Sequence, residues 1–93
     1  MCYDVVIVGA GCAGLTAGIY ARSKLMKTLV LDSGRVGGQL VSLYPEKGIH
    51  NYPGFETIQA RKLSDKLYAQ AEAAECEIHE NEKVREIVNG CEE

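Results

Sequence analysis

The chain has 93 residues, enough for one small domain, and 46% of them are hydrophobic and 25% charged, as in ordinary soluble globular proteins. This balance argues against disorder, and a net charge of -3 gives no electrostatic reason to expect nucleic acid or an anionic membrane as a partner. The first apolar run, residues 5–8, is too short to span a bilayer, and no basic segment precedes it. We therefore expect neither a membrane span nor a signal peptide.

The first thirty residues predict a strand, a helix and a second strand. Residues 3–8 are β-branched and almost continuously apolar, which is typical of a strand buried on both faces of a parallel sheet. Residues 13–24 suit a helix whose small apolar side, formed by Leu15, Ala17, Gly18 and Ala21, faces the sheet. Residues 28–32 read as the second strand. The predicted fold class is α/β, with a Rossmann-like βαβ unit and a parallel sheet.

The rest of the chain is expected to hold a long loop, one more helix and two short strands. Residues 33–58 contain five glycines and both prolines, so we predict a functional loop there. Residues 59–75 have apolar side chains at helical spacing, which predicts an amphipathic helix. Residues 76–79 and 83–88 are strand candidates on either side of a polar turn, and residues 89–93 form a polar tail.

A glycine pattern joins the first strand to the first helix. Residues 9–14 read GAGCAG, which is GxGxxG in the context that makes this motif a dinucleotide-binding fingerprint. Gly9 permits the tight turn, Gly11 lets the backbone approach a pyrophosphate, and Gly14 lets the helix lie close to the strand. The helix start then offers free N–H groups and a favourable dipole to an anion. The alternative is a glycine turn before an ordinary helix.

Asp32 ends the second strand, where a carboxylate can accept hydrogen bonds from a ribose diol. The same carboxylate repels a 2′-phosphate, which argues against NADP in this site. Arg35 is a candidate partner for such a phosphate, but Asp32 stands nearer the expected ribose. The fingerprint alone leaves NAD and FAD open.

Three later segments favour FAD by resemblance. Residues 34–40 read GRVGGQL, residues 43–47 read LYPEK, and residues 51–55 read NYPGF. In this order they resemble the thioredoxin-reductase-like flavoproteins, and the LYPEK segment closely resembles the thioredoxin-reductase-type ferredoxin–NADP⁺ reductases. The resemblance covers residues 3 to about 88. It implies FAD with its adenine near Asp32, its pyrophosphate on residues 9–14 and its flavin along residues 37–44 and at Asn51.

The cofactor-binding residues predicted on this basis come from the glycine turn, the end of the second strand and the long loop. They are Gly9, Gly11, Cys12, Ala13, Gly14, Asp32, Ser33, Gly38, Gln39, Leu40, Tyr44 and Asn51. The amides of Gln39 and Asn51 have the donors and acceptors that a flavin pyrimidine edge requires, and the Tyr44 ring offers a surface for stacking. The plainer alternatives are two solvated loop amides and a core aromatic residue.

The cysteines indicate no redox or metal centre. Cys2, Cys12, Cys76 and Cys91 include no CxxC pair, and no histidine stands at zinc-finger spacing from them. Cys12 lies where a helix N-terminus favours a thiolate, yet bound pyrophosphate would disfavour it, so we expect a residue that fits a small space. We predict free thiols, no metal, and a reducing, cytoplasmic location.

The resemblance also shows what these residues lack. Members of the family carry a second GxGxxG for NAD(P)H, a later Gly-Asp segment at the FAD site and, in thioredoxin reductases proper, a redox CxxC. None occurs in residues 1–93. We therefore expect the N-terminal portion of an FAD-binding domain, without catalytic residues of its own and inactive alone, from an NAD(P)H-dependent flavin oxidoreductase. The resemblance further implies a redox-protein acceptor and a homodimer. The alternative is a non-catalytic FAD- or NAD-binding module that completes its site with another chain.

Overall fold

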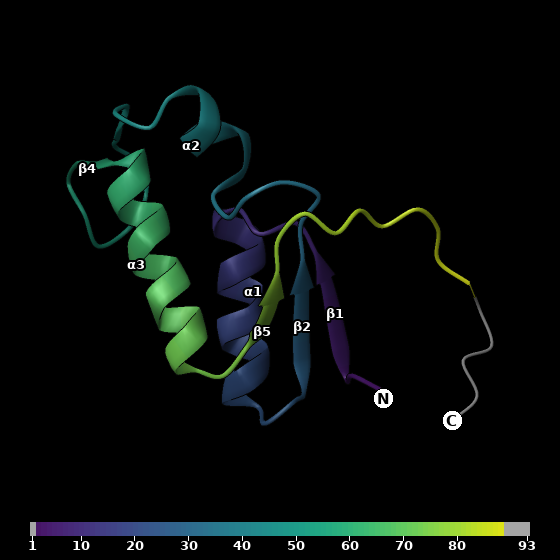
Figure 1. Cartoon of the computed structure of the whole chain (residues 1–93). Helices are drawn as coiled ribbons and strands as arrows, with labels where there is room; N and C mark the ends of the chain where they lie inside the picture. Colours follow the sequence, from purple (N-terminus) through teal and green to yellow (C-terminus); the bar gives the residue numbers. More distant parts are fainter. Residues whose placement is uncertain (1, 89–93) are drawn as a thin grey trace.

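The structure is a computed structural model that describes residues 2–88, apart from the side chains of residues 39, 40 and 42. Its centre is a parallel sheet of three strands: β1 (Val5–Val8), β2 (Thr28–Leu31) and β5 (Glu77–His79), in the order β1-β2-β5 (Figure 1). Val6 pairs with Leu29, and Val30 pairs with Ile78. The α/β class and the parallel sheet are confirmed.

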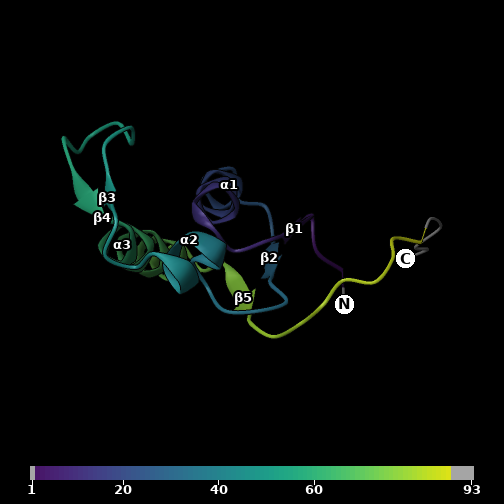
Figure 2. The same cartoon turned by 90° about the horizontal axis from the view of Figure 1, so that it is seen from above.

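Two long helices pack beside this sheet. Helix α1 (Cys12–Ser23) lies over one face, and α3 (Ala60–Ala73) lies next to α1 on the β5 side (Figure 2). In α1 the buried residues are Leu15, Gly18 and Ala21, which recur every third position. Ala17 was expected on the same side but is exposed, because it points away from the line that these three residues form.

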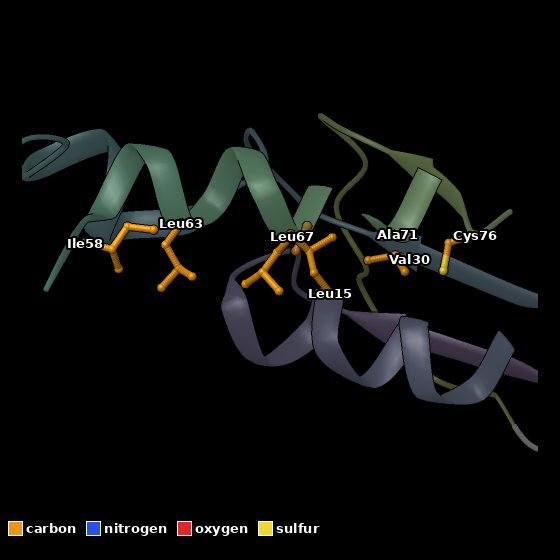
Figure 3. Close-up of a cluster of buried hydrophobic side chains, with 8 residues drawn as sticks. Leu15, Val30, Ile58, Leu63, Leu67, Ala71 and Cys76 are labelled. Atoms are coloured by element: carbon orange, nitrogen blue, oxygen red, sulfur yellow. The ribbon is translucent and has the colours of Figure 1, made fainter. Parts of the chain in front are cut away.

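The hydrophobic core lies where α1, α3 and β2 meet. Leu63 and Leu67 point from α3 toward Leu15 of α1 (Figure 3), and Leu15 and Val30 are fully buried. Burial of one such side chain stabilises the fold by about 1.5–3 kcal/mol. A Cβ at Gly18 would lie 3.1 Å from Sγ of Cys76 and 3.4 Å from a Val30 methyl group, so a small residue keeps α1 close to the sheet.

The long loop expected at residues 33–58 contains regular structure. Helix α2 (Gly38–Leu43) and an antiparallel pair, β3 (Gly48–Ile49) and β4 (Ile58–Gln59), lie within it. These elements are too short to show a sequence period. Backbone hydrogen bonds instead fix the segment to the start of α3, from Ala60 N–H to Lys47 C=O (2.9 Å) and from Arg61 N–H to Pro45 C=O (3.0 Å).

Two strand predictions are wrong. Strand β1 is not buried on both faces, because Val6 is 51% and Val8 63% exposed on the face opposite α1, which no helix of the described chain covers. Residues 83–88 form no strand, since no described segment lies beside them to complete a ladder. The polar tail predicted at 89–93 falls outside the described residues. Among residues 2–88, no helix is long and apolar enough to cross a membrane.

Candidate functional site

The glycine turn between β1 and α1 adopts a conformation that its glycines make possible. Gly9 has φ +110°, a region that L side chains rarely adopt, and its N–H donates to Leu31 C=O (2.6 Å). A Cβ at Gly14 would collide with the carbonyl group of Gly9. The roles predicted for both glycines, a tight turn and close helix–strand packing, agree with this geometry.

The start of α1 offers unpaired N–H groups to open space. Gly11 is the N-cap residue, with φ -78° and ψ -169°, and no side chain caps the helix. A Cβ at Gly11 would meet nothing within 4 Å. Among the described residues, no hydrogen bond uses the N–H of Cys12, Ala13 or Gly14. Three such donors at the positive end of a helix, with open space beside Gly11, suit an anionic ligand.

Asp32 is tied directly to this turn. Its Oδ2 accepts a hydrogen bond from Ala10 N–H (2.7 Å), and its Oδ1 accepts one from Gly34 N–H (2.8 Å). Each carboxylate oxygen keeps further acceptor capacity for a ligand hydroxyl. Asp32 therefore stabilises the glycine turn as well as lying beside it. Sequence reasoning had assigned it only the ligand contact.

Cys12 behaves as a packing residue rather than a reactive thiol. Its side chain contacts the hydrophobic core, and its carbonyl accepts a hydrogen bond from the Thr16 hydroxyl (2.7 Å). Burial raises the pKa of the Cys12 thiol, and a hydrogen bond to its own backbone offsets only part of this effect. The thiol is thus protonated at neutral pH, which agrees with the small-space interpretation.

A cleft of about 910 Å³ opens beside Asp32, between the loop after β2 and helix α3. We call it the Asp32 cleft. Three predicted site residues line it: Asp32, Ser33 and Gly38. Gly38 also lies against the glycine turn, because a Cβ there would be 3.9 Å from Cα of Gly11. The cleft and the glycine turn are therefore neighbours.

A second hollow, of about 650 Å³, lies along the exposed side of α1. We call it the α1 groove. The predicted site residues Cys12 and Ala13 line it at one end, with Tyr52 and Pro53 from the 51–55 segment. This arrangement brings the 51–55 segment to the start of α1. The Tyr52 ring also packs on the core and lies 6.4 Å from the Phe55 ring, centroid to centroid.

The remaining predicted residues are less closely gathered. Gln39 and Leu40 belong to α2, and their side chains lie outside the described part of the structure. Tyr44 is 59% exposed and Asn51 is exposed, and neither lines the two hollows. Their assignment to a flavin remains a prediction.

Sequence reasoning missed a group of residues that helix α3 and the segment after β5 bring to the Asp32 cleft. They are Arg61, Ser64, Asp65, Tyr68 and Glu80. Their pairing with residues 32–38 is tertiary and has no local sequence signal. The one available hint was a basic residue in the first turn of α3, where acidic residues are favoured.

Comparison with known proteins assigns this arrangement to a family. The family description "Pyridine nucleotide-disulphide oxidoreductase" matches residues 3–93. The chain belongs to this family. Among its relatives, a ferredoxin–NADP reductase of Streptococcus gordonii is 43% identical over 89 residues, 95% of this chain and 28% of the relative. One from Streptococcus sanguinis is 42% identical over 87 residues, 92% and 27% respectively.

Solved structures of thioredoxin reductases have a similar fold over the matched residues. Thioredoxin reductase from Lactococcus lactis superposes with a TM-score of 0.73 and 44% identity, over 84% of this chain and 25% of that one. The enzyme from T. acidophilum gives a TM-score of 0.73 and 35% identity, over 85% and 25%. The chain spans roughly a quarter of the length of these relatives. Over the matched residues, the chain shares a Rossmann-like fold with these reductases.

Proposed function

We propose that the chain contributes the ADP-binding part of an FAD site in an NAD(P)H-dependent oxidoreductase similar to ferredoxin–NADP reductases and thioredoxin reductases. The observation that carries the proposal is the start of α1, where three N–H groups lack a described partner, a Cβ at Gly11 would meet open space, and Asp32 is hydrogen-bonded to Ala10. Free N–H groups at a helix start bind an anion, and a carboxylate beside them binds a ribose diol.

The fit to FAD combines this geometry with the family. The Asp32 carboxylate disfavours a 2′-phosphate at the adjacent ribose, which supports FAD or NAD over NADP at this position. The flavin implied by the family favours FAD between the remaining two. In this assignment Gly9, Gly11 and Gly14 form the pyrophosphate turn, and Asp32 and Ser33 lie at the adenosine.

The flavin end of the cofactor follows the resemblance. Gln39, Tyr44 and Asn51 are its expected contacts, with the amides at the ring's polar edge and the Tyr44 ring against its face. Bound FAD supplies the capacity to accept a hydride from NAD(P)H and pass electrons on. The residues of this chain bind and orient it, and a redox protein is the proposed acceptor of the whole enzyme. We likewise retain the homodimer and the cytoplasmic location as proposals.

The chain by itself is expected to lack reductase activity. Hydride transfer needs the nicotinamide held against the flavin ring, and residues 1–93 contain a single GxGxxG, which we assign to FAD. The test is NADPH and NADH oxidation by the purified chain with added FAD, against a protein-free control. Turnover well above that control would contradict the assignment of the single glycine motif.

Identification of the bound nucleotide tests the proposal itself. The chain is purified after incubation with equal concentrations of FAD and NAD, desalted and denatured, and the released nucleotide is identified by chromatography. We expect FAD with the wild type and none with Gly11→Val, whose side chain fills the open space. Recovery of NAD, or equal recovery of FAD from both proteins, would refute the proposal.

A further inference from the structure

Two arginines of the Asp32 cleft have no assigned function. Arg35 lies in the loop after β2, and Arg61 lies in the first turn of α3, so the two come from opposite walls. Among the described side chains, the ion pairs are Arg22 with Glu75 and His79 with Glu77. Neither guanidinium group of the cleft takes part in one, although both line the same hollow.

The carboxylates of the cleft do not account for these arginines. Both oxygens of Asp32 accept backbone N–H groups, and Oε2 of Glu80 accepts the N–H of Val36 (2.7 Å). Asp65, one turn after Arg61 on α3, is exposed to solvent, as Arg35 and Arg61 are, and solvent screens the charges of all three. Among the described side chains, none of these three carboxylates forms an ion pair with Arg35 or Arg61, so the guanidinium groups remain available to a ligand.

The position of Arg61 is also electrostatically unfavourable for its own helix. Helix α3 has no acidic residue in its first turn and no side-chain cap, and a cation there opposes the helix dipole. A short chain of contacts connects this turn with the glycine motif. The Gly37 N–H donates to Ala10 C=O (2.9 Å), and a Cβ at Gly37 would lie 2.9 Å from Oγ of Ser64 on α3. Gly37 therefore lies between the glycine turn and Ser64, which is one turn after Arg61 on α3.

We infer that Arg35 and Arg61 bind the phosphate groups of the ADP moiety from the two walls of the Asp32 cleft. The inference rests on the proposed function and adds two side-chain cations to a site otherwise built from backbone N–H groups. Guanidinium groups suit this task, because they are always charged and present several donors to phosphate oxygens. Asp32 then contacts the ribose, and the arginines neutralise the charge beside it.

The test compares ligands with and without phosphate. ADP and adenosine are titrated calorimetrically into the wild type, Arg35→Gln, Arg61→Gln and the double variant at low salt. We expect each single variant to bind ADP about tenfold more weakly, the low end for hydrogen bonds between charged groups, while adenosine affinity changes less than about twofold. The control is Lys62→Gln, which removes the neighbouring exposed cation of α3 that does not line the cleft.

Each other outcome counts against the inference in a distinguishable way. Unchanged ADP affinity in both variants overturns it and leaves the proposed function intact. Equal losses for ADP and adenosine mark the arginines as residues that shape the cleft, which also overturns it. A loss as large in Lys62→Gln shows a diffuse charge effect rather than a phosphate contact. Absence of ADP binding by the folded wild type overturns both the inference and the proposed function.

Discussion

Replacement of Asp32 tests whether this residue stabilises the glycine turn, apart from the ligand contact proposed for it. Asp32→Ala removes the acceptors of two backbone N–H groups, those of Ala10 and Gly34. A hydrogen bond from a neutral donor to a charged acceptor contributes about 1.5–3 kcal/mol. Because Asp32 is half-buried and water can reach the site, we take the lower end, about 3 kcal/mol for both bonds.

Asp32→Asn provides an intermediate step. Its amide oxygen can accept one of the two N–H groups, whereas its NH₂ group faces the other donor. We expect it to lose about 1.5 kcal/mol, which lowers the Tm of a domain of this size by roughly 6–12 °C, and Asp32→Ala to lose about twice as much. Urea unfolding followed by far-UV circular dichroism, without nucleotide, measures both losses.

Asp65→Ala is the matched control. Asp65 is an exposed carboxylate on the wall of the same cleft, and its side chain makes no hydrogen bond with another described residue. Its loss should change the free energy of unfolding by less than about 0.5 kcal/mol. The reasoning fails if Asp32→Ala is at least as stable as Asp65→Ala. It also fails if Asp32→Asn and Asp32→Ala lose the same free energy of unfolding.

Further variants separate folding from binding. Gly14→Ala should destabilise the chain by about 1–3 kcal/mol or more, because the new Cβ meets the backbone of Gly9. Gly11→Ala should unfold like the wild type and bind ADP less well. Thermal melts measure the stability of both variants, and calorimetry measures their ADP affinity. Tyr44→Ala should raise the fluorescence of bound flavin and leave ADP affinity nearly unchanged, and equal losses for FAD and ADP would show instead that the ring supports the fold. Hydrogen bonds from Tyr3 (2.7 Å) and His79 (2.9 Å) hold the pKa of Glu77 below its ordinary value of 4.5. The ionised Glu77 therefore contributes to the free energy of unfolding above pH 4.5, and this contribution should be lost as the pH falls through the lowered pKa. Tyr3→Phe should flatten that acid limb in urea unfolding from pH 3 to 6, roughly the range in which carboxyl groups titrate, and an unchanged limb would exclude the Tyr3 contact as its cause.

The parts of the fold that sequence predicted are those whose causes are local. The strand, the glycine turn, helix α1 and Asp32 follow one another within the first 32 residues, and the requirement at Gly9 and Gly14 is steric. Helix α3 was predictable because Leu63, Leu67 and Ala71 recur at helical spacing and are buried.

The parts that sequence did not predict depend on partners distant in the chain. Helix α2 and the β3–β4 pair are too short for a periodic pattern and are held by hydrogen bonds to the start of α3. Residues 83–88 have the composition of a strand, but composition supplies no neighbour with which to pair. Arg61 lines the Asp32 cleft together with residues of the loop after β2, and Gly37 and Ser64 lie close to each other where this loop meets α3.

The central claim is that the glycine turn and Asp32 bind the ADP part of FAD. Two-dimensional ¹H–¹⁵N NMR of the labelled chain during titration with ADP observes the responsible N–H groups themselves. The account predicts saturable shifts, shared by FAD and abolished in Gly11→Val, at the amides of Cys12, Ala13 and Gly14 and around Asp32. No shift in a folded wild-type chain, or shifts confined to amides remote from this turn, would contradict it.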